Sequence, residues 1–158
     1  LFTLDSYAGA TERLFGLSWG AEDLSAAVGA STNRDEHGNW LPLYEMARSF
    51  CLLAAAAAEV TAIDTVFTDF RDQDGLLRYA LHARRDGFSG MLAIHPAQVE
   101  TINAAFEPAP EEIERARRIV DLFDNNPDAG TVGLDGRMID RPHLVQAKRL
   151  LLQAKRGR

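Results

Sequence analysis

Short apolar runs alternate with longer helix-like segments along the first two thirds of the chain, and this alternation constrains the fold most. The runs at 14–19, 61–67 and 91–94 are apolar or rich in β-branched residues, and a segment with helical features follows each of them. Such an order is typical of parallel β/α units, because two parallel strands need a crossover connection between them. The sequence therefore predicts an α/β fold built on a parallel sheet.

The helical segments are marked by their periodicity and by their ends. Pro42 suits the first turn of a helix over 43–60, and a second proline begins a helix over 96–106. Gly87 suits the C-terminal cap of a helix over 75–85. The core-facing positions predicted for the first of these helices recur at helical spacing: Leu43, Met46, Ala47, Phe50, Cys51 and Ala54.

The C-terminal third of the chain has a different pattern. A charged amphipathic helix is predicted over 111–123, and a polar linker follows it. Residues 131–140 resemble a hairpin with an Asp-Gly turn, and a helix is predicted over 141–155. Asp140 is placed to cap that last helix.

Composition excludes some classes of partner. The 158 residues are 46% hydrophobic and 25% charged, with a formal net charge of −6. The acidic balance argues against a nucleic acid or an anionic membrane as partner. No apolar run reaches the roughly 18 residues that a membrane span needs. The single cysteine, Cys51, is expected to pack as a small hydrophobe and fits a reducing compartment, so we expect a cytoplasmic protein.

Candidate chemistry lies where the predicted strands end, because ligands of parallel β/α proteins gather at the carboxyl ends of the strands. Three segments follow such ends, at 20–23, 68–72 and 95–96. Asp23 in the first of them has two interpretations: an oxygen ligand for a hard metal such as Mg²⁺, or the N-cap of a helical turn over 23–28. The residues alone favour the cap.

The other titratable candidates also have structural interpretations. His95, placed between an apolar run and a proline, is more typical of a structural histidine bonded to the backbone than of a catalytic one. Asp140 could cap a helix, or it could reach an active site in another subunit. Asp64 lies within a predicted strand, where it could face a barrel interior or pair with an arginine. No histidine pair has the spacing of a zinc site, and no phosphate-binding glycine motif is present.

Four stretches together resemble one family: LSWGAEDLSAAVGA, AIDTVFTDFRD, GFSGMLAIHPAQVETINAAF and VGLDGRMIDRPHLVQAKRLL. They are similar, in the same order, to the citrate lyase β-subunit-like and malyl-CoA lyase-like proteins of the HpcH/HpaI aldolase superfamily. The similarity covers nearly the whole chain. GAEDL, AIHPAQV and GRMIDRP are specific as a set, whereas GAED alone is a weak signal.

The resemblance implies a (β/α)₈ TIM barrel, of which this chain carries the C-terminal part. Residues 1–125 would supply about strands six to eight, and residues 126–158 would form a lid or oligomerisation segment made of a hairpin and a helix. The family's metal-binding glutamate and substrate-binding arginine would precede Leu1. We therefore expect the chain to be part of a longer product and to be inactive alone.

The resemblance also implies roles for single residues. Asp23 aligns with the family's metal-ligand aspartate, which reverses the preference for a cap. Asp140 aligns with an aspartate proposed as the acid/base that handles the proton at the acetyl methyl group. The residues expected to contact substrate are Gly20, Ala21 and Glu22 at the keto acid, and Ile94, His95 and Pro96 near the CoA chain.

The implied activity is a Mg²⁺-dependent carbon–carbon lyase. It would cleave a β-hydroxyacyl-CoA of the citryl-, malyl- or citramalyl-CoA type into acetyl-CoA and a keto acid. The C-terminal segment would cover the active site of a neighbouring subunit, so a homotrimer or a multiple of three is expected. Two alternatives stay open: an aldolase acting on free hydroxy-keto acids, and a non-catalytic assembly fragment whose acids are helix caps.

Overall fold

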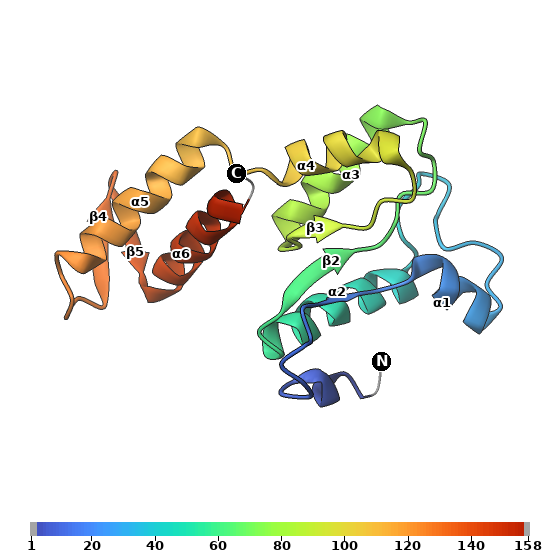
Figure 1. Cartoon of the computed structure of the whole chain (residues 1–158), viewed down its shortest axis with the longest axis horizontal. Coiled ribbons are helices and arrows are strands. Elements are labelled where there is room, and N and C mark those ends of the chain that lie inside the picture. Colours follow the sequence, from blue (N-terminus) through green and yellow to red (C-terminus); the bar gives the residue numbers. More distant parts are fainter. Residues whose placement is uncertain (1–2, 157–158) are drawn as a thin grey trace. The chain divides into compact units, whose positions relative to one another are not determined.

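The computed structural model of the chain describes residues 3–156, which form two compact units. The first unit extends to Phe106 and holds a parallel sheet with its helices, and the second begins at Glu107 and holds a hairpin between two helices (Figure 1). The predicted α/β fold with a parallel sheet is confirmed.

The sheet of the first unit has three strands in the order in which they occur along the chain. β1 (Gly16–Ser18) pairs with β2 (Thr61–Asp64), and β2 pairs with β3 (Gly90–Met91), both in parallel. Because parallel neighbours point the same way, the carboxyl ends of all three strands lie at one edge of the sheet. The segments that follow the strands therefore start from that common edge.

Helices connect the strands and cover them. α2 (Pro42–Ala57) packs on β1 and β2, whereas α3 (Gln73–Asp86) and α4 (Val99–Phe106) pack on β3 and on each other. The remaining helical pieces are short: the 3₁₀ turns η1 (Leu4–Tyr7) and η2 (Pro96–Gln98), and the helix α1 (Ala21–Val28). The core of this unit is made mostly of small and aromatic side chains, including Ala55, Ala80 and Phe88, and it also contains Leu76.

The predicted helix ends are confirmed where local chemistry sets them. Pro42 occupies the first turn of α2, and Gly87 closes α3 with a φ of 115°, a left-handed conformation that favours glycine. Asp72, at the end of the segment 68–72 that follows β2, caps α3 by accepting the Gly75 N–H at 2.8 Å.

Two strands end earlier than the sequence predicts, because side chains take the backbone groups that would extend them. The Thr65 N–H donates to the carboxylate of Asp64 at 2.8 Å, and β2 stops there. The N–H groups of Ile94 and His95 both donate to the side-chain oxygen of Gln98, so β3 does not reach these residues.

The buried face of α2 differs from the predicted one. Ala47, Cys51 and Ala54 are buried as expected, but Met46 and Phe50 are 46% and 41% exposed. Their places facing the core are taken by Tyr44, Ala55 and Arg48, among others. An amphipathic pattern with apolar residues on two sides does not say which side meets the sheet.

The second unit has its own small core. α5 (Pro110–Asp124) packs on α6 (Arg141–Arg156), and both contact the antiparallel hairpin of β4 (Thr131–Leu134) and β5 (Arg137–Asp140). At the predicted Asp-Gly turn both residues have positive φ, 51° and 73°, as a type I′ turn requires. The buried side chains are Ala116, Ile119, Phe123, Leu134, Ile139, Leu144 and Ala147.

The two compact units divide at residues 106 and 107. α5 lies in the second unit because it buries Ala116, Ile119 and Phe123 against α6 and the hairpin. The boundary expected at residues 125 and 126 concerns a barrel part and a lid segment, and it stays a prediction.

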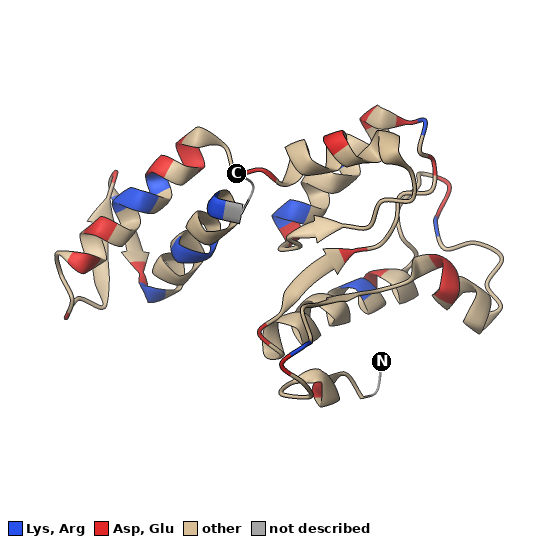
Figure 2. Cartoon of the chain, viewed as in Figure 1, with Lys and Arg blue, Asp and Glu red and all other residues tan. Residues whose placement is uncertain are grey.

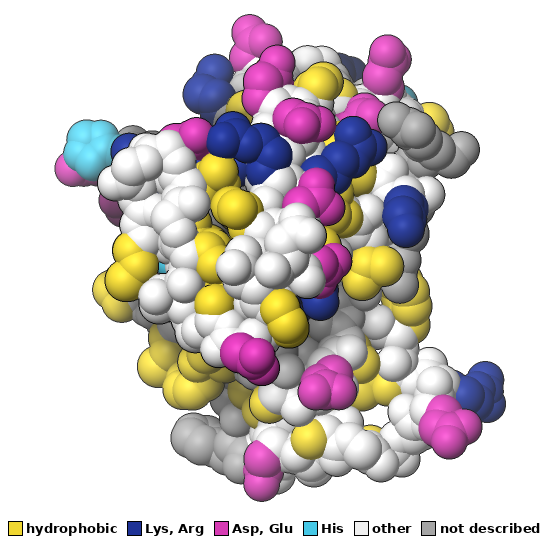
Figure 3. All heavy atoms as spheres, turned by 90° about the vertical axis from the view of Figure 1, so that its left-hand side faces the viewer, with side chains coloured by type: hydrophobic (Ala, Val, Ile, Leu, Met, Phe, Trp, Pro, Cys, Tyr) yellow, Lys and Arg dark blue, Asp and Glu magenta, His cyan; other side chains and the backbone are white. Residues whose placement is uncertain are grey.

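Charge is mixed over the helices and the surface. α5 carries acids towards both ends and arginines in its middle, and α6 is basic (Figure 2). Basic and acidic side chains intermingle on the face that Figure 3 shows, with apolar groups between them. Among the described residues, no helix has both the length and the apolar character needed to cross a bilayer.

Candidate active site at the carboxyl edge of the sheet

Asp23 lies just beyond the carboxyl end of β1, in the first turn of α1. The helix begins at Ala21 and its N-cap is Gly20, so the interpretation of Asp23 as the N-cap is wrong. The Leu24 N–H donates to the Gly20 carbonyl at 2.9 Å, which starts the helix two residues earlier than the sequence predicts. A negative side chain in a first helical turn is favoured by the helix dipole, but it is not required for capping here.

The carboxylate of Asp23 lies against Gly20. A Cβ atom added to Gly20 would come within 2.3 Å of Asp23 Oδ2, so the carboxylate occupies the space that any other side chain would fill. Asp23 is exposed, and the described residues offer its carboxylate no hydrogen bond or ion pair. Its oxygens are therefore available to a ligand.

The neighbours of Asp23 differ in exposure. Gly20 and Glu22 reach solvent, whereas Ala21 is 1% exposed. Glu22 Oε1 accepts the Asn33 side-chain amide at 2.9 Å. The Ala21 N–H points at Thr65 Oγ1, 3.4 Å away.

The loop between α1 and α2 is held on aromatic rings. The Arg34 guanidinium lies 3.5 Å from the ring centroid of Trp40, and its Nη1 donates to the Gly38 carbonyl at 2.7 Å. Burial lowers the pKa of Arg34. Trp40 in turn packs edge-on against Trp19, with ring centroids 5.1 Å apart. The loop is thereby tied to the residue that precedes Gly20.

Ile94, His95 and Pro96 follow β3 at the same edge of the sheet, and all three are exposed. His95 Nδ1 accepts the Ala97 N–H at 3.1 Å, which is the backbone bond that the structural interpretation predicts. The imidazole also stacks on Phe70, with centroids 4.5 Å apart. The ring is thus fixed in place by a backbone contact within its own segment and by Phe70 from the loop between β2 and α3.

Asp140 belongs to the second unit, where it precedes α6 as predicted. Its Oδ1 accepts the His143 backbone N–H at 3.4 Å and also contacts His143 Nδ1. The hydrogen bond from His143 holds the pKa of Asp140 below its usual value. The structure therefore groups Gly20–Asp23 with Ile94–Pro96 at one sheet edge and places Asp140 in a separate unit.

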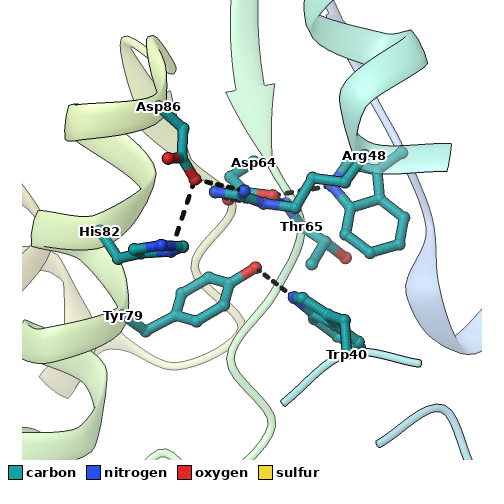
Figure 4. Close-up of polar contacts among 8 residues, drawn as sticks. Trp40, Arg48, Asp64, Thr65, Tyr79, His82 and Asp86 are labelled. Atoms are coloured by element: carbon teal, nitrogen blue, oxygen red, sulfur yellow. Dashed lines mark hydrogen bonds and ion pairs between the residues drawn. The ribbon is translucent and has the colours of Figure 1, made fainter. Parts of the chain in front are cut away.

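Asp64, the last residue of β2, is fully buried and points into the helix layer (Figure 4). Its Oδ1 accepts the Trp19 indole N–H at 2.7 Å and the Thr65 N–H at 2.8 Å. Its Oδ2 accepts Arg48 Nε at 2.9 Å and Nη2 at 2.8 Å. Of the two interpretations of Asp64, pairing with an arginine is confirmed.

Arg48 extends this network from α2 to α3. Its Nη1 bonds to Asp86 Oδ2, and His82 Nδ1 lies 3.4 Å from the same oxygen (Figure 4). Burial by itself would lower the pKa of Arg48, but the two carboxylates outweigh it and raise the pKa. Close by, the Trp40 indole N–H donates to the Tyr79 hydroxyl at 3.3 Å. Burial raises the pKa of Tyr79 to about 12, so the phenol stays protonated.

Two of these partners were missed by the sequence analysis. Arg48 shares the buried face of α2 with Tyr44, Cys51 and Ala55, and a charge on an otherwise apolar stripe signals a buried partner. His143 follows Asp140 by three residues, which is the spacing of contacts across a first helical turn.

A cavity of about 200 Å³ lies behind β1, between the strand, α1, α2 and η1. Its lining includes Trp19, Gly20 and Cys51. Burial raises the pKa of Cys51 to about 11, which keeps the thiol neutral and agrees with the predicted packing role.

The residues present suit a hard cation only in part. No group of three or more His, Cys, Asp or Glu side chains able to hold a metal occurs among residues 3–156. Mg²⁺, however, is typically bound through one or two carboxylates, with water and substrate oxygens completing the shell. One exposed, unpaired carboxylate at the sheet edge fits that pattern as part of a ligand set.

Comparison with known proteins agrees with the resemblance. A citrate lyase subunit beta-like protein of Mycobacterium tuberculosis is 35% identical over 145 residues, which are 92% of this chain and 52% of the relative. The mitochondrial citramalyl-CoA lyase of Rattus norvegicus is 38% identical over 138 residues, which are 86% of this chain and 39% of that protein. The chain spans about half the length, or less, of these curated relatives.

A solved structure extends the agreement to the fold. The protein CitE from Mycobacterium tuberculosis, in complex with magnesium, acetoacetate and coenzyme A, matches 87% of this chain with a TM-score of 0.73 and 35% identity. The match covers 51% of the CitE chain. Residues 3–96, more than half of the 158, match the family described as HpcH/HpaI aldolase/citrate lyase. The chain therefore belongs to the HpcH/HpaI aldolase/citrate lyase family.

Proposed function

We propose that the protein is a Mg²⁺-dependent carbon–carbon lyase that acts on a β-hydroxyacyl-CoA of the citryl-, malyl- or citramalyl-CoA type. The observation that carries the proposal is the exposed, unpaired Asp23 carboxylate at the carboxyl edge of a parallel sheet. Membership of a family with a named citramalyl-CoA lyase, and likeness to a CitE structure that contains magnesium and coenzyme A, support it. In this proposal the sheet is strands six to eight of a TIM barrel.

Asp23 supplies one oxygen ligand of the metal. When bound, Mg²⁺ polarises the carbonyl oxygen of the keto acid as a Lewis acid. The N–H groups of Glu22 and Asp23, in the first turn of α1, have no acceptor within the helix, so they favour the carboxylate of the keto acid. Gly20, Ala21 and Glu22 line this position, and Ile94, His95 and Pro96 border the path of the CoA chain.

Asp140 handles the proton at the acetyl methyl carbon. In condensation its carboxylate removes that proton, while the carbonyl oxygen of the keto acid gains a proton from water. In cleavage the β-hydroxyl proton leaves to water, the carbon–carbon bond breaks, and protonated Asp140 returns a proton to the carbon that keeps the electron pair. The hydrogen bond from His143 lowers the pKa of Asp140 and so favours its carboxylate form, which is the form that accepts a proton. Asp140 acts on the site of a neighbouring subunit, in a homotrimer or a multiple of three.

The test is an activity assay of the full-length protein with malyl-CoA, citramalyl-CoA and citryl-CoA, with the 158-residue chain alone measured in parallel. We expect acetyl-CoA and a keto acid from at least one substrate, loss of activity with EDTA, and recovery with Mg²⁺. Asp23→Asn should lower kcat/KM by at least about 100-fold, because polarising the carbonyl is worth several kcal/mol in the transition state.

Three further outcomes would each count against one part of the proposal. Cleavage of free hydroxy-keto acids without any CoA ester would favour the aldolase alternative. Full activity in EDTA, or in Asp23→Asn, would contradict the assignment of Asp23 to the metal. Activity of the 158-residue chain alone would contradict the expectation that it is inactive by itself.

A further inference from the structure

Gly20 lies between two residues that are both tied to the end of β2. Trp19, on one side, donates its indole N–H to Asp64 Oδ1 at 2.7 Å. Ala21, on the other side, directs its backbone N–H at Thr65 Oγ1 at 3.4 Å. Asp64 and Thr65 are 0% and 1% exposed, so water does not compete for these contacts. The backbone on both sides of Gly20 is thereby fixed to the neighbouring strand.

The position of Gly20 sets the position of the Asp23 carboxylate. The Gly20 carbonyl accepts the Leu24 N–H at 2.9 Å and so fixes the first turn of α1, which carries Asp23. The Asp23 carboxylate packs so close to Gly20 that a Cβ atom added at residue 20 would lie only 2.3 Å from Asp23 Oδ2. A shift of Gly20 away from β2 would therefore move the carboxylate with it.

The anchor on β2 is itself rigid. The Asp64 carboxylate accepts four hydrogen bonds, two of them from the Arg48 guanidinium that also bonds to Asp86 of α3. Charge-assisted bonds in a buried site are strong and leave the carboxylate no alternative orientation with the same number of donors. The hydrogen bonds from Trp19 and Ala21 thus reach the end of β2, which α2 and α3 hold in place.

We propose that Trp19, Asp64 and Thr65, together called the β2 clamp, are positioning residues that hold Asp23 ready to bind the metal. The inference rests on the proposed function in one respect, that Asp23 is a metal ligand. None of the three residues needs to touch the ion. Their effect comes from preorganisation, because a ligand already held in its binding position loses less conformational entropy when the metal arrives.

Thr65→Val tests the β2 clamp, because it removes the Oγ1 acceptor of the Ala21 N–H and keeps the size and branching of the side chain. The measurements are the Kd for Mn²⁺, used as the spectroscopic probe for the metal, and the exchange rate of the Ala21 amide, both in the full-length protein. We expect the Kd to rise about 3- to 10-fold, somewhat less than for direct partners of metal ligands. We expect faster exchange of the Ala21 amide, and Thr65→Ser should restore both values.

Thr101→Val is the matched control. It removes a hydroxyl that donates to the Gln73 side chain at 2.8 Å, between α4 and α3. It makes the same change in composition, and the hydrogen bond that it removes involves none of residues 19–23. We expect its Mn²⁺ affinity and its Ala21 exchange rate to equal those of the unaltered protein.

The outcomes separate the β2 clamp from the proposed function. Weaker Mn²⁺ binding in Asp23→Asn but not in Thr65→Val would overturn the clamp and leave the proposed function standing. Equal weakening in Thr65→Val and Thr101→Val would also overturn it, because the effect would then be general destabilisation. Unchanged binding in Asp23→Asn would reject the proposed function and, with it, the link from the clamp to metal. If Thr65→Val does not fold, Trp19→Phe, which removes the indole donor to Asp64, replaces it with the same expected rise in Kd.

Discussion

Asp64 ends β2 and Asp23 follows β1 at the same sheet edge, but the two acids have opposite surroundings. Asp64 at the end of β2 is fully buried and accepts bonds from Trp19, Arg48 and Thr65. Asp23 beyond β1 is exposed, and no described residue donates to it. A carboxylate surrounded by donors has no lone pair left for a ligand, whereas one without donors keeps all of them. The comparison assigns Asp64 to the fold and leaves the Asp23 carboxylate free for the metal-binding role that we propose.

The largest effect expected from this comparison is the loss of stability in Asp64→Ala. The substitution leaves the Arg48 guanidinium buried without its main partner, and breaking one side of a buried ion pair costs about 3–5 kcal/mol. Urea unfolding measures the loss. Asp121→Ala on the exposed side of α5 is the control, with an expected change within about 0.5 kcal/mol. A loss below about 1 kcal/mol in Asp64→Ala would mean that the network does not hold the fold.

Gly20→Ala tests the other acid of the comparison, Asp23, by displacing its carboxylate. The new Cβ would meet Asp23 Oδ2 at 2.3 Å, and the flexible carboxylate can turn away at little cost in stability. We expect a nearly unchanged melting temperature but a Mn²⁺ affinity lower by about 10-fold, as for other changes that misplace a metal ligand.

Gly130→Ala controls for the change in backbone freedom, because a Cβ there has open space around it. The account would be contradicted if both glycine variants bound Mn²⁺ as well as the unaltered protein.

A smaller effect is expected at Asp140, the acid to which the proposed function assigns the proton transfer. Since the bond from His143 lowers the pKa of Asp140, His143→Ala should raise that pKa towards the usual value of 3.8. A lowered pKa in the folded state gives stability that is present above the usual pKa and is lost as the pH falls through the folded value. The stability of the variant should therefore fall less steeply below about pH 4.

NMR titration of the Asp140 carboxyl carbon measures this shift directly. Asp135 is an internal control in the same unit, because Arg118 and not His143 lowers its pKa. An Asp140 pKa that does not move in His143→Ala would show that the contact does not tune this acid.

Much of the fold could be predicted because its signals are local. Strand-like runs, prolines at helix starts, the glycine after α3 and the Asp-Gly turn all report the backbone of their own segment. The early end of β2 could not be predicted, because it depends on Thr65 bonding to a side chain that Arg48 holds in place. The buried face of α2 also depends on which neighbour is present, and Met46 and Phe50 satisfy the same periodicity as the true core residues.

The features of the candidate site likewise divide into local ones, which could be predicted, and ones that depend on distant segments, which could not. The sequence predicted that Asp23 follows a strand and that Asp140 precedes a helix, because both statements concern adjacent residues. It could not show that Asp23 lacks donors while Asp64 has four hydrogen bonds, since burial and pairing arise only when distant segments meet. It left the partner of Asp64 open between a barrel interior and an unnamed arginine, and only the packing of α2 on β2 identifies Arg48.

The most direct test of the central claim is the affinity of the full-length protein for Mg²⁺, compared with that of Asp23→Asn by calorimetric titration. The variant keeps the size of the side chain and removes only its charge. The account predicts that Asp23→Asn weakens Mg²⁺ binding by at least about 10-fold while the melting temperature stays nearly unchanged. Equal affinity in the two proteins would contradict it and would leave Asp23 as an exposed acid at a helix start.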